Sequence, residues 1–310
     1  MLKANDFINI PSPLHRLDLS SFGVKNHQVW VKRDDLIHSV ISGNKWRKLK
    51  LNIDSFLDSS NSHIISMGGA FSNHLLAVSY ICNRYKIHNT LFVRGEKPKK
   101  LNDILLACER YNTNLVFLER KHYSDKAWVN DFIIKNYQNS FFIPEGGANE
   151  LGILGCAKII EEIEEEFDEI YCEVGTGATF MGIEAALKKN QNLIGVVVLK
   201  GAEKIKTNLE NEYKQIFSKK INPKSVLVHD YHMGGYAKYS SKLIDFMRLF
   251  YLRTGIKTDP IYSGKLFYAL VHKLLKENNQ KQKKIIALHS GGLAGINGFE
   301  KRYKLSIFSN

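Results

Sequence analysis

The sequence predicts an α/β protein with a mainly parallel sheet, and three observations support this fold class. Short apolar runs rich in β-branched residues alternate with longer segments of helical period, which is the pattern of βαβ units. Twice, a strand-like run leads through a glycine turn directly into a helix-like segment. With 310 residues and 44% hydrophobic content, the chain can bury the core of one large or two modest domains, and we expect two.

The predicted strands follow one another along the whole chain. In order, they are residues 29–32, 63–66, 90–93, 115–118, 169–172, 193–199 and 284–288. Helix-like segments lie between them, and two of these, 75–85 and 181–188, directly follow a glycine turn. Both turns present backbone amides at the start of a helix, where anions bind well.

Composition argues against several classes of partner. The net charge of +13 would suit nucleic acid, but the lysines form short scattered clusters without a zinc-finger spacing, a ribonucleoprotein motif or an arginine-rich arm, so we expect no nucleic-acid partner. No apolar run is long enough to span a membrane, so we expect a cytoplasmic protein. The acidic run at 161–166 reads as a solvated helix face, and we expect no metal site.

The first candidate for chemistry is Lys45, which follows Gly43 and Asn44 at the start of a predicted helix. The positive end of the helix and the cations of Arg47 and Lys48 disfavour the charged form of its amine. A neutral amine can form an imine with a carbonyl group. Taken alone, a lysine in a basic cluster is more often a surface charge, so this interpretation needs other residues to support it.

The loop of Gly175, Thr176, Gly177, Ala178 and Thr179 supports it. Its small residues allow backbone amides to surround a phosphate at the start of the next helix, and the two threonines can add hydroxyl donors. The loop lacks the Lys-Ser/Thr ending of a P-loop and the third glycine of a dinucleotide site. A small phosphorylated cofactor fits it better than a nucleotide, and a purely structural turn is the alternative.

Three further segments place polar side chains on turns. Ser72 and Asn73 stand at a helix start, where they can hold a substrate carboxylate or act as an ordinary N-cap. The segment from Asp259 to Lys265 is a turn that can expose Tyr262. Ser290 follows an apolar strand, at the carboxyl end where α/β sheets bind ligands.

In this order and spacing, the five segments resemble the family of 1-aminocyclopropane-1-carboxylate deaminases and D-cysteine desulfhydrases, which belong to the tryptophan-synthase-β-like class (fold type II) of pyridoxal-phosphate enzymes. The resemblance runs from Pro11 to Gly292. It implies mainly parallel twisted sheets flanked by helices, in a large cofactor-binding domain of residues 1–51 and 155–310 and a small mobile domain of residues 52–154. It also implies a homodimer.

The resemblance assigns a role to each matching position. Lys45 holds pyridoxal 5'-phosphate and shuttles protons, Asn73 bonds the ring hydroxyl, and Ser290 lies near the pyridine nitrogen as a neutral donor. The cofactor-binding set is Lys45, Asn73, Gly175, Thr176, Gly177, Ala178, Thr179 and Ser290. The substrate-binding set is Ser72, Asn73, His74, Tyr236, Tyr262 and Ser263, of which Ser72, Tyr236 and Tyr262 count as catalytic together with Lys45.

Two positions favour one activity within the family. Its true deaminases resemble one another in carrying Glu after the tyrosine and Leu after the histidine of the last motif, where this chain has Ser263 and Ser290. The pattern favours a D-cysteine desulfhydrase, whose α,β-elimination gives pyruvate, ammonia and sulfide from a small amino acid. Phe71 and Ala178 depart from the family, which usually has Gln and Gly there. The alternatives are a deaminase that forms 2-oxobutanoate and ammonia, another lyase or a racemase, and a non-catalytic protein that binds amino acids or nucleic acid.

Overall fold

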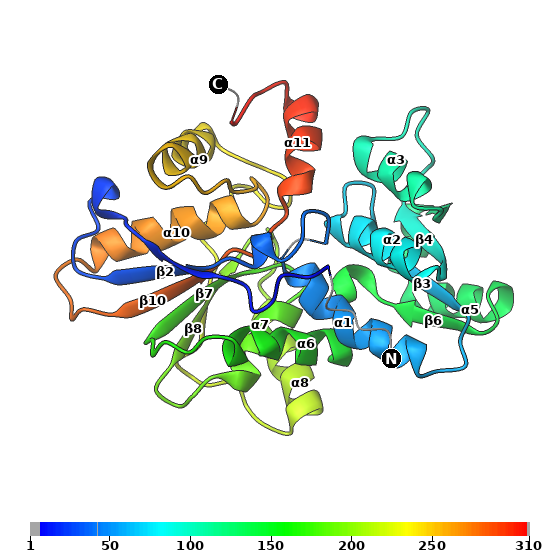
Figure 1. Ribbon diagram of the computed structural model, residues 1–310, viewed down its shortest axis with the longest axis horizontal. Helices are drawn as coiled ribbons and strands as arrows, with labels where there is room; N and C mark the ends of the chain where they lie inside the picture. Colours follow the sequence, from blue (N-terminus) through cyan, green and yellow to red (C-terminus); the bar gives the residue numbers. More distant parts are fainter. Residues whose placement is uncertain (1–6, 42, 309–310) are drawn as a thin grey trace. The chain divides into compact units, whose positions relative to one another are not determined.

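The structure, a computed structural model, describes residues 7–41 and 43–308 and divides into two compact units (Figure 1). The first unit comprises the chain up to Asn44 and from Cys156 onward, and the second comprises Lys45–Gly155. Both crossings fall inside helices, α1 (Asn44–Leu57) and α6 (Glu150–Glu161). The predicted boundaries, 52 and 154, lie seven residues and one residue from these crossings. The mobility of the smaller part stays a prediction.

The first unit is built on a six-stranded sheet of order β1-β2-β10-β7-β8-β9. Only β1 runs antiparallel to its neighbour, and all other pairs are parallel. The strands are β1 (Leu14–Leu17), β2 (Gln28–Lys32), β7 (Glu169–Val174), β8 (Asn192–Val197), β9 (Val226–Val228) and β10 (Lys284–Leu288). The predicted α/β class with a mainly parallel sheet is therefore confirmed.

Helices accompany this sheet. Besides parts of α1 and α6, they are α7 (Ala178–Ala186), α8 (Ile205–Phe217), α9 (Ser241–Thr254), α10 (Ser263–Lys276) and α11 (Ile296–Tyr303). Short 3₁₀ turns lie at Ser20–Phe22, Asp34–Leu36 and Leu293–Gly295.

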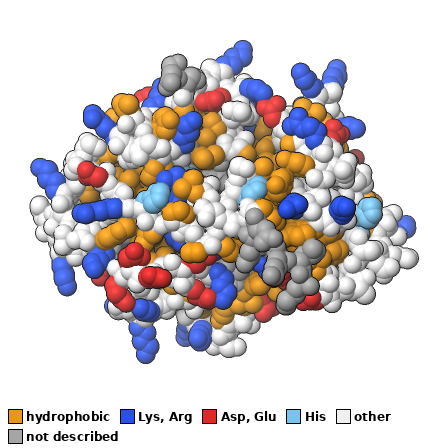
Figure 2. All heavy atoms as spheres, viewed as in Figure 1, with side chains coloured by type: hydrophobic (Ala, Val, Ile, Leu, Met, Phe, Trp, Pro, Cys, Tyr) orange, Lys and Arg blue, Asp and Glu red, His pale blue; other side chains and the backbone are white. Residues whose placement is uncertain are grey.

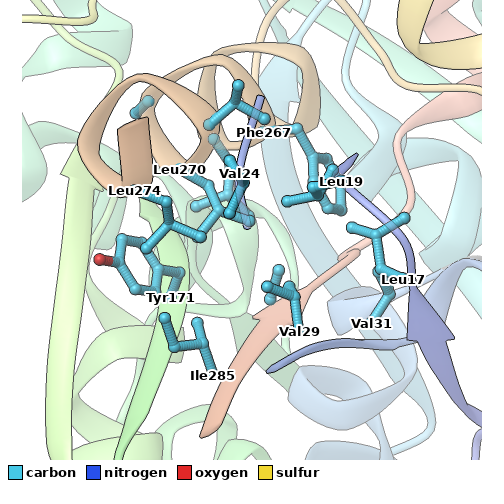
Figure 3. Packing of buried hydrophobic residues seen from close by; sticks show 14 of the residues in the cluster. Leu17, Leu19, Val24, Val29, Val31, Tyr171, Phe267, Leu270, Leu274 and Ile285 are labelled. Carbon is cyan, nitrogen blue, oxygen red and sulfur yellow. The ribbon is translucent and has the colours of Figure 1, made fainter. Parts of the chain in front are cut away.

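The main core of the first unit lies between α10 and the sheet (Figure 3). Leu270 and Leu274 are one helical turn apart on α10 and are fully buried, because this spacing keeps both on the face toward the strands. Across from them, Val29 of β2, Tyr171 of β7 and Ile285 of β10 supply the sheet side of the cluster. This packing holds β7 and β10, the two strands that lead into the predicted site loops.

The second unit has a four-stranded, fully parallel sheet of order β5-β4-β3-β6. Its strands are β3 (His63–Gly69), β4 (His88–Arg94), β5 (Asn114–Leu118) and β6 (Ser140–Ile143). Its other helices are α2 (Asn73–Tyr85), α3 (Asp103–Arg110), α4 (Arg120–Ser124) and α5 (Lys126–Asn136), with a 3₁₀ turn at Glu145–Gly147. Gly155 lets α6 approach α1 closely, since a Cβ there would lie 2.0 Å from the carbonyl oxygen of Arg47.

The three strands that were not predicted, β1, β6 and β9, all lie at sheet edges. β1 and β6 each bury only their last residue, and none of the three residues of β9 is fully buried. These strands are also short, with four residues in β1 and β6 and three in β9, and so few residues do not establish a strand pattern in the sequence.

All four cysteines are buried, and none is in a disulfide. Burial raises the pKa of the Cys108 thiol to about 12 and also raises the pKa of Cys82. Among the described helices, none is long and apolar enough to cross a membrane. On the face drawn in Figure 2, lysine and arginine side chains are dispersed between acidic and apolar ones.

We predict that Leu270→Ala lowers the free energy of unfolding by about 2–5 kcal/mol, because it removes a fully buried side chain and leaves a cavity. Leu252→Ala is the matched control, since Leu252 is 77% exposed on α9 and its truncation should cost no more than about 0.5 kcal/mol. Urea unfolding followed by circular dichroism measures both. Equal losses in the two variants would contradict this account of the core.

Candidate active site

Two neighbouring strands of the first unit end in loops that the sequence singled out. β7 ends at Val174 and continues into the glycine loop, while β10 ends at Leu288 and continues into the turn around Ser290. The two strands pair in parallel, with Ile286 beside Ile170. Both loops therefore leave the same edge of the sheet, which is where α/β proteins bind ligands.

The loop after β7 has the features of a backbone anion site. Gly177 is the N-cap of α7 with φ 93°, and a Cβ there would lie 2.1 Å from Cδ2 of Leu209, so the position requires glycine. The first helical bond runs from the Met181 amide to the Gly177 carbonyl, which leaves the amides of residues 178–180 without an acceptor in the helix. Ala178 lies within the helix at a buried position, so its methyl group adds no left-handed strain.

The residue before Lys45 is bonded to both loops. The side-chain amide of Asn44 donates to the Thr179 hydroxyl at 3.1 Å, and its backbone amide donates to the Ser290 carbonyl at 3.1 Å. Gly43, with φ 69°, approaches this carbonyl so closely that a Cβ would lie 1.4 Å from its oxygen. The geometry of the turn ahead of Lys45 therefore requires glycine at position 43, and Asn44 joins the turn to both loops.

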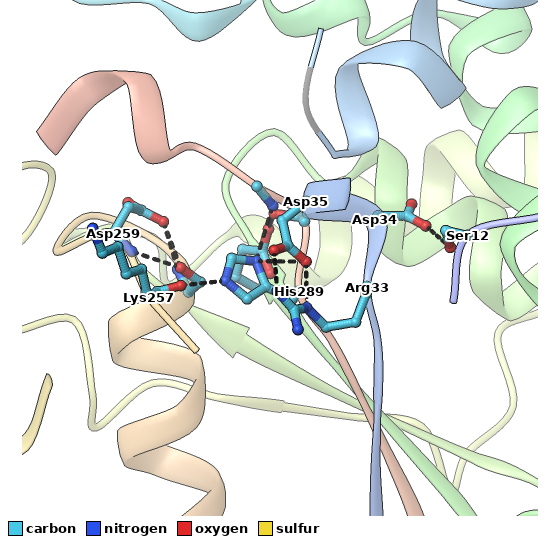
Figure 4. A network of polar contacts seen from close by, with 11 residues as sticks. Ser12, Arg33, Asp34, Asp35, Lys257, Asp259 and His289 are labelled. Carbon is cyan, nitrogen blue, oxygen red and sulfur yellow. Dashed lines mark hydrogen bonds and ion pairs between the residues drawn. The ribbon is translucent and has the colours of Figure 1, made fainter. Parts of the chain in front are cut away.

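A polar network holds the turn that carries Ser290 (Figure 4). His289 Nδ1 accepts from the Gly291 amide at 3.2 Å, so the proton on Nε2 is available to donate to the Lys257 carbonyl at 2.7 Å. The backbone amide of Asp35 donates to the His289 carbonyl at 3.0 Å. Arg33 binds the Asp35 carboxylate through two bonds of 2.8 and 2.7 Å. These bonds fix the backbone on both sides of the turn.

Asp259 shapes the loop that carries Tyr262. Its buried carboxylate accepts hydrogen bonds from the backbone amides of Ile261, Tyr262 and Ser263 at 2.8, 2.8 and 2.9 Å. The Ser263 hydroxyl donates to Asp259 at 2.8 Å and accepts from its backbone amide at 2.8 Å. Ser263 is thus fully buried and bonded within the loop, and its predicted contact with substrate stays a prediction.

Tyr262 lies beside the glycine loop and Tyr236. A Cβ on Gly175 would lie 3.5 Å from the Tyr262 ring, and the ring centroids of the two tyrosines are 6.2 Å apart. Burial raises the pKa of the Tyr262 hydroxyl well above its usual value, and the neighbouring Tyr236, Asp259 and Glu173 raise it further. Tyr262 is therefore a neutral hydrogen-bonding group near neutral pH.

Lys265 holds the loop that carries Tyr236. This lysine is fully buried, and its ammonium donates to the carbonyls of His232 at 2.9 Å and Gly235 at 2.8 Å. The backbone between these carbonyls has positive φ at Met233, Gly234 and Gly235, so it needs such anchoring. Lys265 was not among the predicted site residues, because a lysine in a turn is usually a solvated charge.

In the second unit, α2 begins at the predicted Ser72–His74 segment. The Ser72 hydroxyl accepts from the amides of His74 at 3.2 Å and Leu75 at 3.4 Å, so it is the N-cap. Its own proton remains available to a ligand, and Asn73 is the first residue of the helix. Phe71, just before the cap, is 38% exposed.

His74 is buried and neutral. The Ser66 hydroxyl donates to the Ile143 carbonyl at 2.8 Å and lies 2.9 Å from His74 Nε2, so the proton of that pair belongs to Nε2. Burial lowers the pKa of His74 well below its usual value, and the cations of Lys45 and Lys48 lower it further. Nδ1 has no hydrogen-bond partner within the described residues. It therefore offers an acceptor to a ligand.

Glu173 is a second residue of this region that was not among the predicted site residues. It is the fifth residue of β7, is 5% exposed, and accepts a hydrogen bond from the Ser290 hydroxyl. The available signal was a charged residue between the apolar residues 170–172 and Val174, because an unpaired buried carboxylate is costly. Glu173, which was not predicted, is thus a neighbour of three predicted features, namely Ser290, Tyr262 and the glycine loop.

The residues present fit a small phosphorylated cofactor. The start of α7, in the first unit, presents three amides that have no acceptor within the helix, and such amides can bind a phosphate. Within the described ranges, no three His, Cys, Asp or Glu side chains gather as metal ligands would.

Comparisons with known proteins agree with this chemistry. A family model described as "Pyridoxal-phosphate dependent enzyme" matches residues 7–291. A mitochondrial bifunctional D-cysteine desulfhydrase/1-aminocyclopropane-1-carboxylate deaminase of Arabidopsis thaliana is 29% identical over 93% of this chain and 78% of its own. A putative 1-aminocyclopropane-1-carboxylate deaminase of Thermotoga maritima is 31% identical over 86% of this chain and 89% of its own. The crystal structure of an ACC deaminase homologue aligns with a TM-score of 0.82 at 26% identity, over 97% of this chain and 95% of that one.

Lys265 should make stability depend on pH. Burial lowers the pKa of Lys265 from 10.5 to about 8, so between these values the folded chain binds fewer protons than the unfolded one. Stability therefore rises with pH there, and the free energy of unfolding should increase by about 2 kcal/mol between about pH 7.5 and pH 10, relative to Lys265→Met. Urea unfolding across this range measures the difference. Parallel pH curves for the two proteins would show that the Lys265 pKa is not lowered.

Proposed function

Because the chain belongs to the pyridoxal-phosphate-dependent enzymes, and within them to the group of 1-aminocyclopropane-1-carboxylate deaminases and D-cysteine desulfhydrases, we propose that its substrate is D-cysteine. The reaction consumes one water and yields pyruvate, ammonia and hydrogen sulfide. The observation that carries the choice is the hydroxyl at positions 263 and 290, where the family's true deaminases resemble one another in carrying Glu and Leu.

In this proposal, each site residue binds a particular part of the cofactor or of the substrate. Lys45 forms the covalent link to the cofactor and moves the proton at the α-carbon of the substrate. The amides of the Gly175–Thr179 loop hold the phosphate, and Asn73 bonds the ring hydroxyl. Ser290 faces the ring nitrogen. When bound, the cofactor withdraws electrons from the α-carbon, which allows a bond there to break.

The substrate-binding residues act by hydrogen bonding and by charge. Ser72 keeps a hydroxyl proton for the substrate carboxylate while it caps α2. Tyr262 and Tyr236 orient the amino acid as neutral donors, which the raised pKa of Tyr262 supports. His74 adds an acceptor at Nδ1 and, because it is neutral, supplies no positive charge to the substrate carboxylate. That charge comes from neighbouring lysines such as Lys48.

A deaminase that opens the ring of 1-aminocyclopropane-1-carboxylate is the second candidate. The name of the relative from Thermotoga maritima favours it, and the name of the relative from Arabidopsis thaliana includes both activities. That reaction also consumes one water and yields 2-oxobutanoate and ammonia. In either case, Phe71 offers no polar contact where the family usually has Gln.

A homodimer, a cytoplasmic location and closure of the smaller part over substrate complete the proposal. The resemblance to the family supports the first and third, and the absence of a predicted membrane span from the sequence supports the second. Sedimentation velocity tests the dimer directly.

A substrate panel separates the two candidates. We expect kcat/KM to be at least about tenfold higher for D-cysteine than for 1-aminocyclopropane-1-carboxylate, a difference of about 1.4 kcal/mol in transition-state binding, because Ser263 and Ser290 stand at the two discriminating positions. L-cysteine and D-serine complete the panel, with pyruvate, 2-oxobutanoate and sulfide measured separately. Faster release of 2-oxobutanoate than of pyruvate would establish the deaminase instead.

Lys45→Ala tests the covalent link. The purified wild-type protein should show the visible absorption band of a lysine-bound cofactor, and the variant should lose it together with at least about a thousandfold of its activity. Lys50→Ala is the control, because Lys50 is on the same helix but forms an ion pair with Asp54. A Lys45→Ala protein that keeps both the band and the activity would refute the role of Lys45.

A further inference from the structure

Glu173 places a carboxylate in the buried interior, where an unpaired charge is costly. The other five residues of β7 are buried, and the strand β7 pairs with β10 on one side and with β8 on the other. An ionised carboxylate is stable in such a place only if polar partners replace its water. Its partner at the edge of the sheet is the Ser290 hydroxyl, which donates to Oε1 of Glu173.

The backbone of Ser290 is held on both sides, which keeps its hydroxyl within hydrogen-bond reach of Glu173. Its carbonyl accepts from the Asn44 amide at 3.1 Å, and Gly43 lies directly against the same carbonyl. The residue before it is bonded to Lys257, and the residue after it is bonded to the His289 ring. The direction of the hydroxyl proton is therefore set by Glu173.

A hydroxyl has one proton and two lone pairs. With its proton directed at Glu173, Ser290 can only accept a hydrogen bond from a third group. A ring nitrogen that faces Ser290 must then carry a proton of its own. We propose that Glu173 is a positioning residue that acts through Ser290 to keep the pyridine nitrogen of the cofactor protonated, and this inference rests on the proposed function.

The charge of Glu173 acts in the same direction as the hydrogen bond, because a nearby negative charge favours a cation. Its field reaches the site, since the carboxylate is one of the groups that raise the pKa of the Tyr262 hydroxyl. A protonated ring withdraws electrons from the substrate more strongly than a neutral one. Ser290 then acts as an acceptor toward a protonated ring nitrogen, and not as the neutral donor that the resemblance implies. In this role it strengthens the withdrawal of electrons by the ring.

The test is the ¹⁵N chemical shift of the ring nitrogen in protein loaded with cofactor labelled at that atom, measured without substrate. We expect the protonated range for wild type and for Ser290→Thr, which keeps the hydroxyl. We expect Glu173→Gln and Ser290→Ala to move to the unprotonated range, because the first removes the charge and the second removes the acceptor. The wild-type measurement alone can overturn the inference, so it does not depend on how well the variants fold.

Glu184→Gln is the matched control. Glu184 is also buried in the first unit, and its carboxylate accepts from the Ser225 hydroxyl at 2.6 Å and the Asn222 amide at 2.6 Å. Its replacement should leave the shift in the protonated range. A bound cofactor with an unprotonated ring in wild type, or a protonated ring in Glu173→Gln, overturns this inference alone. A wild-type protein that binds no cofactor overturns the proposed function as well.

Discussion

The close approach of Gly43 to the carbonyl of Ser290 is the constraint on which the candidate site depends. No side chain fits between these two backbones, and the amide of the next residue, Asn44, uses the same carbonyl as its acceptor. Ser290 itself is placed by the parallel pairing of β10 with β2 and β7. The strand pairing fixes Ser290, and the hydrogen bond from the Asn44 amide to the Ser290 carbonyl then fixes the backbone just before Lys45.

Polar groups, not apolar packing, give the site loops of the first unit their shape. Asp259 holds one loop through three backbone amides, Lys265 holds another through two carbonyls, and the pair of Arg33 and Asp35 supports the turn at His289. Each of these charges is largely removed from water, which reduces the net gain in stability from folding. In return, the loops have a defined conformation, since a buried charge tolerates few arrangements of its partners.

The sequence predicted the central strands well and the site loops in part. β10 was predicted to the residue, because the four residues after Lys284 are apolar and buried, whereas the edge strands β1, β6 and β9 have only four, four and three residues. Gly177 and Ser72 could be predicted because local geometry alone requires a glycine or a capping hydroxyl there. The roles of Glu173 and Lys265 could not be predicted, since their hydrogen-bond partners come from segments over 25 residues away in the chain, and the charge of Glu173 among apolar residues indicated only that the position is unusual.

The burial of the four cysteines affects how readily the protein can be oxidised or modified at sulfur. A thiol reacts with oxidants and with sulfur donors as the thiolate, and burial both raises the pKa of Cys82 and Cys108 and keeps reagents away. If the protein releases sulfide, as proposed above, it meets reduced and partly oxidised sulfur species at its surface. With every thiol in the interior, this chain has no ready site for persulfide formation or for a disulfide with a second molecule.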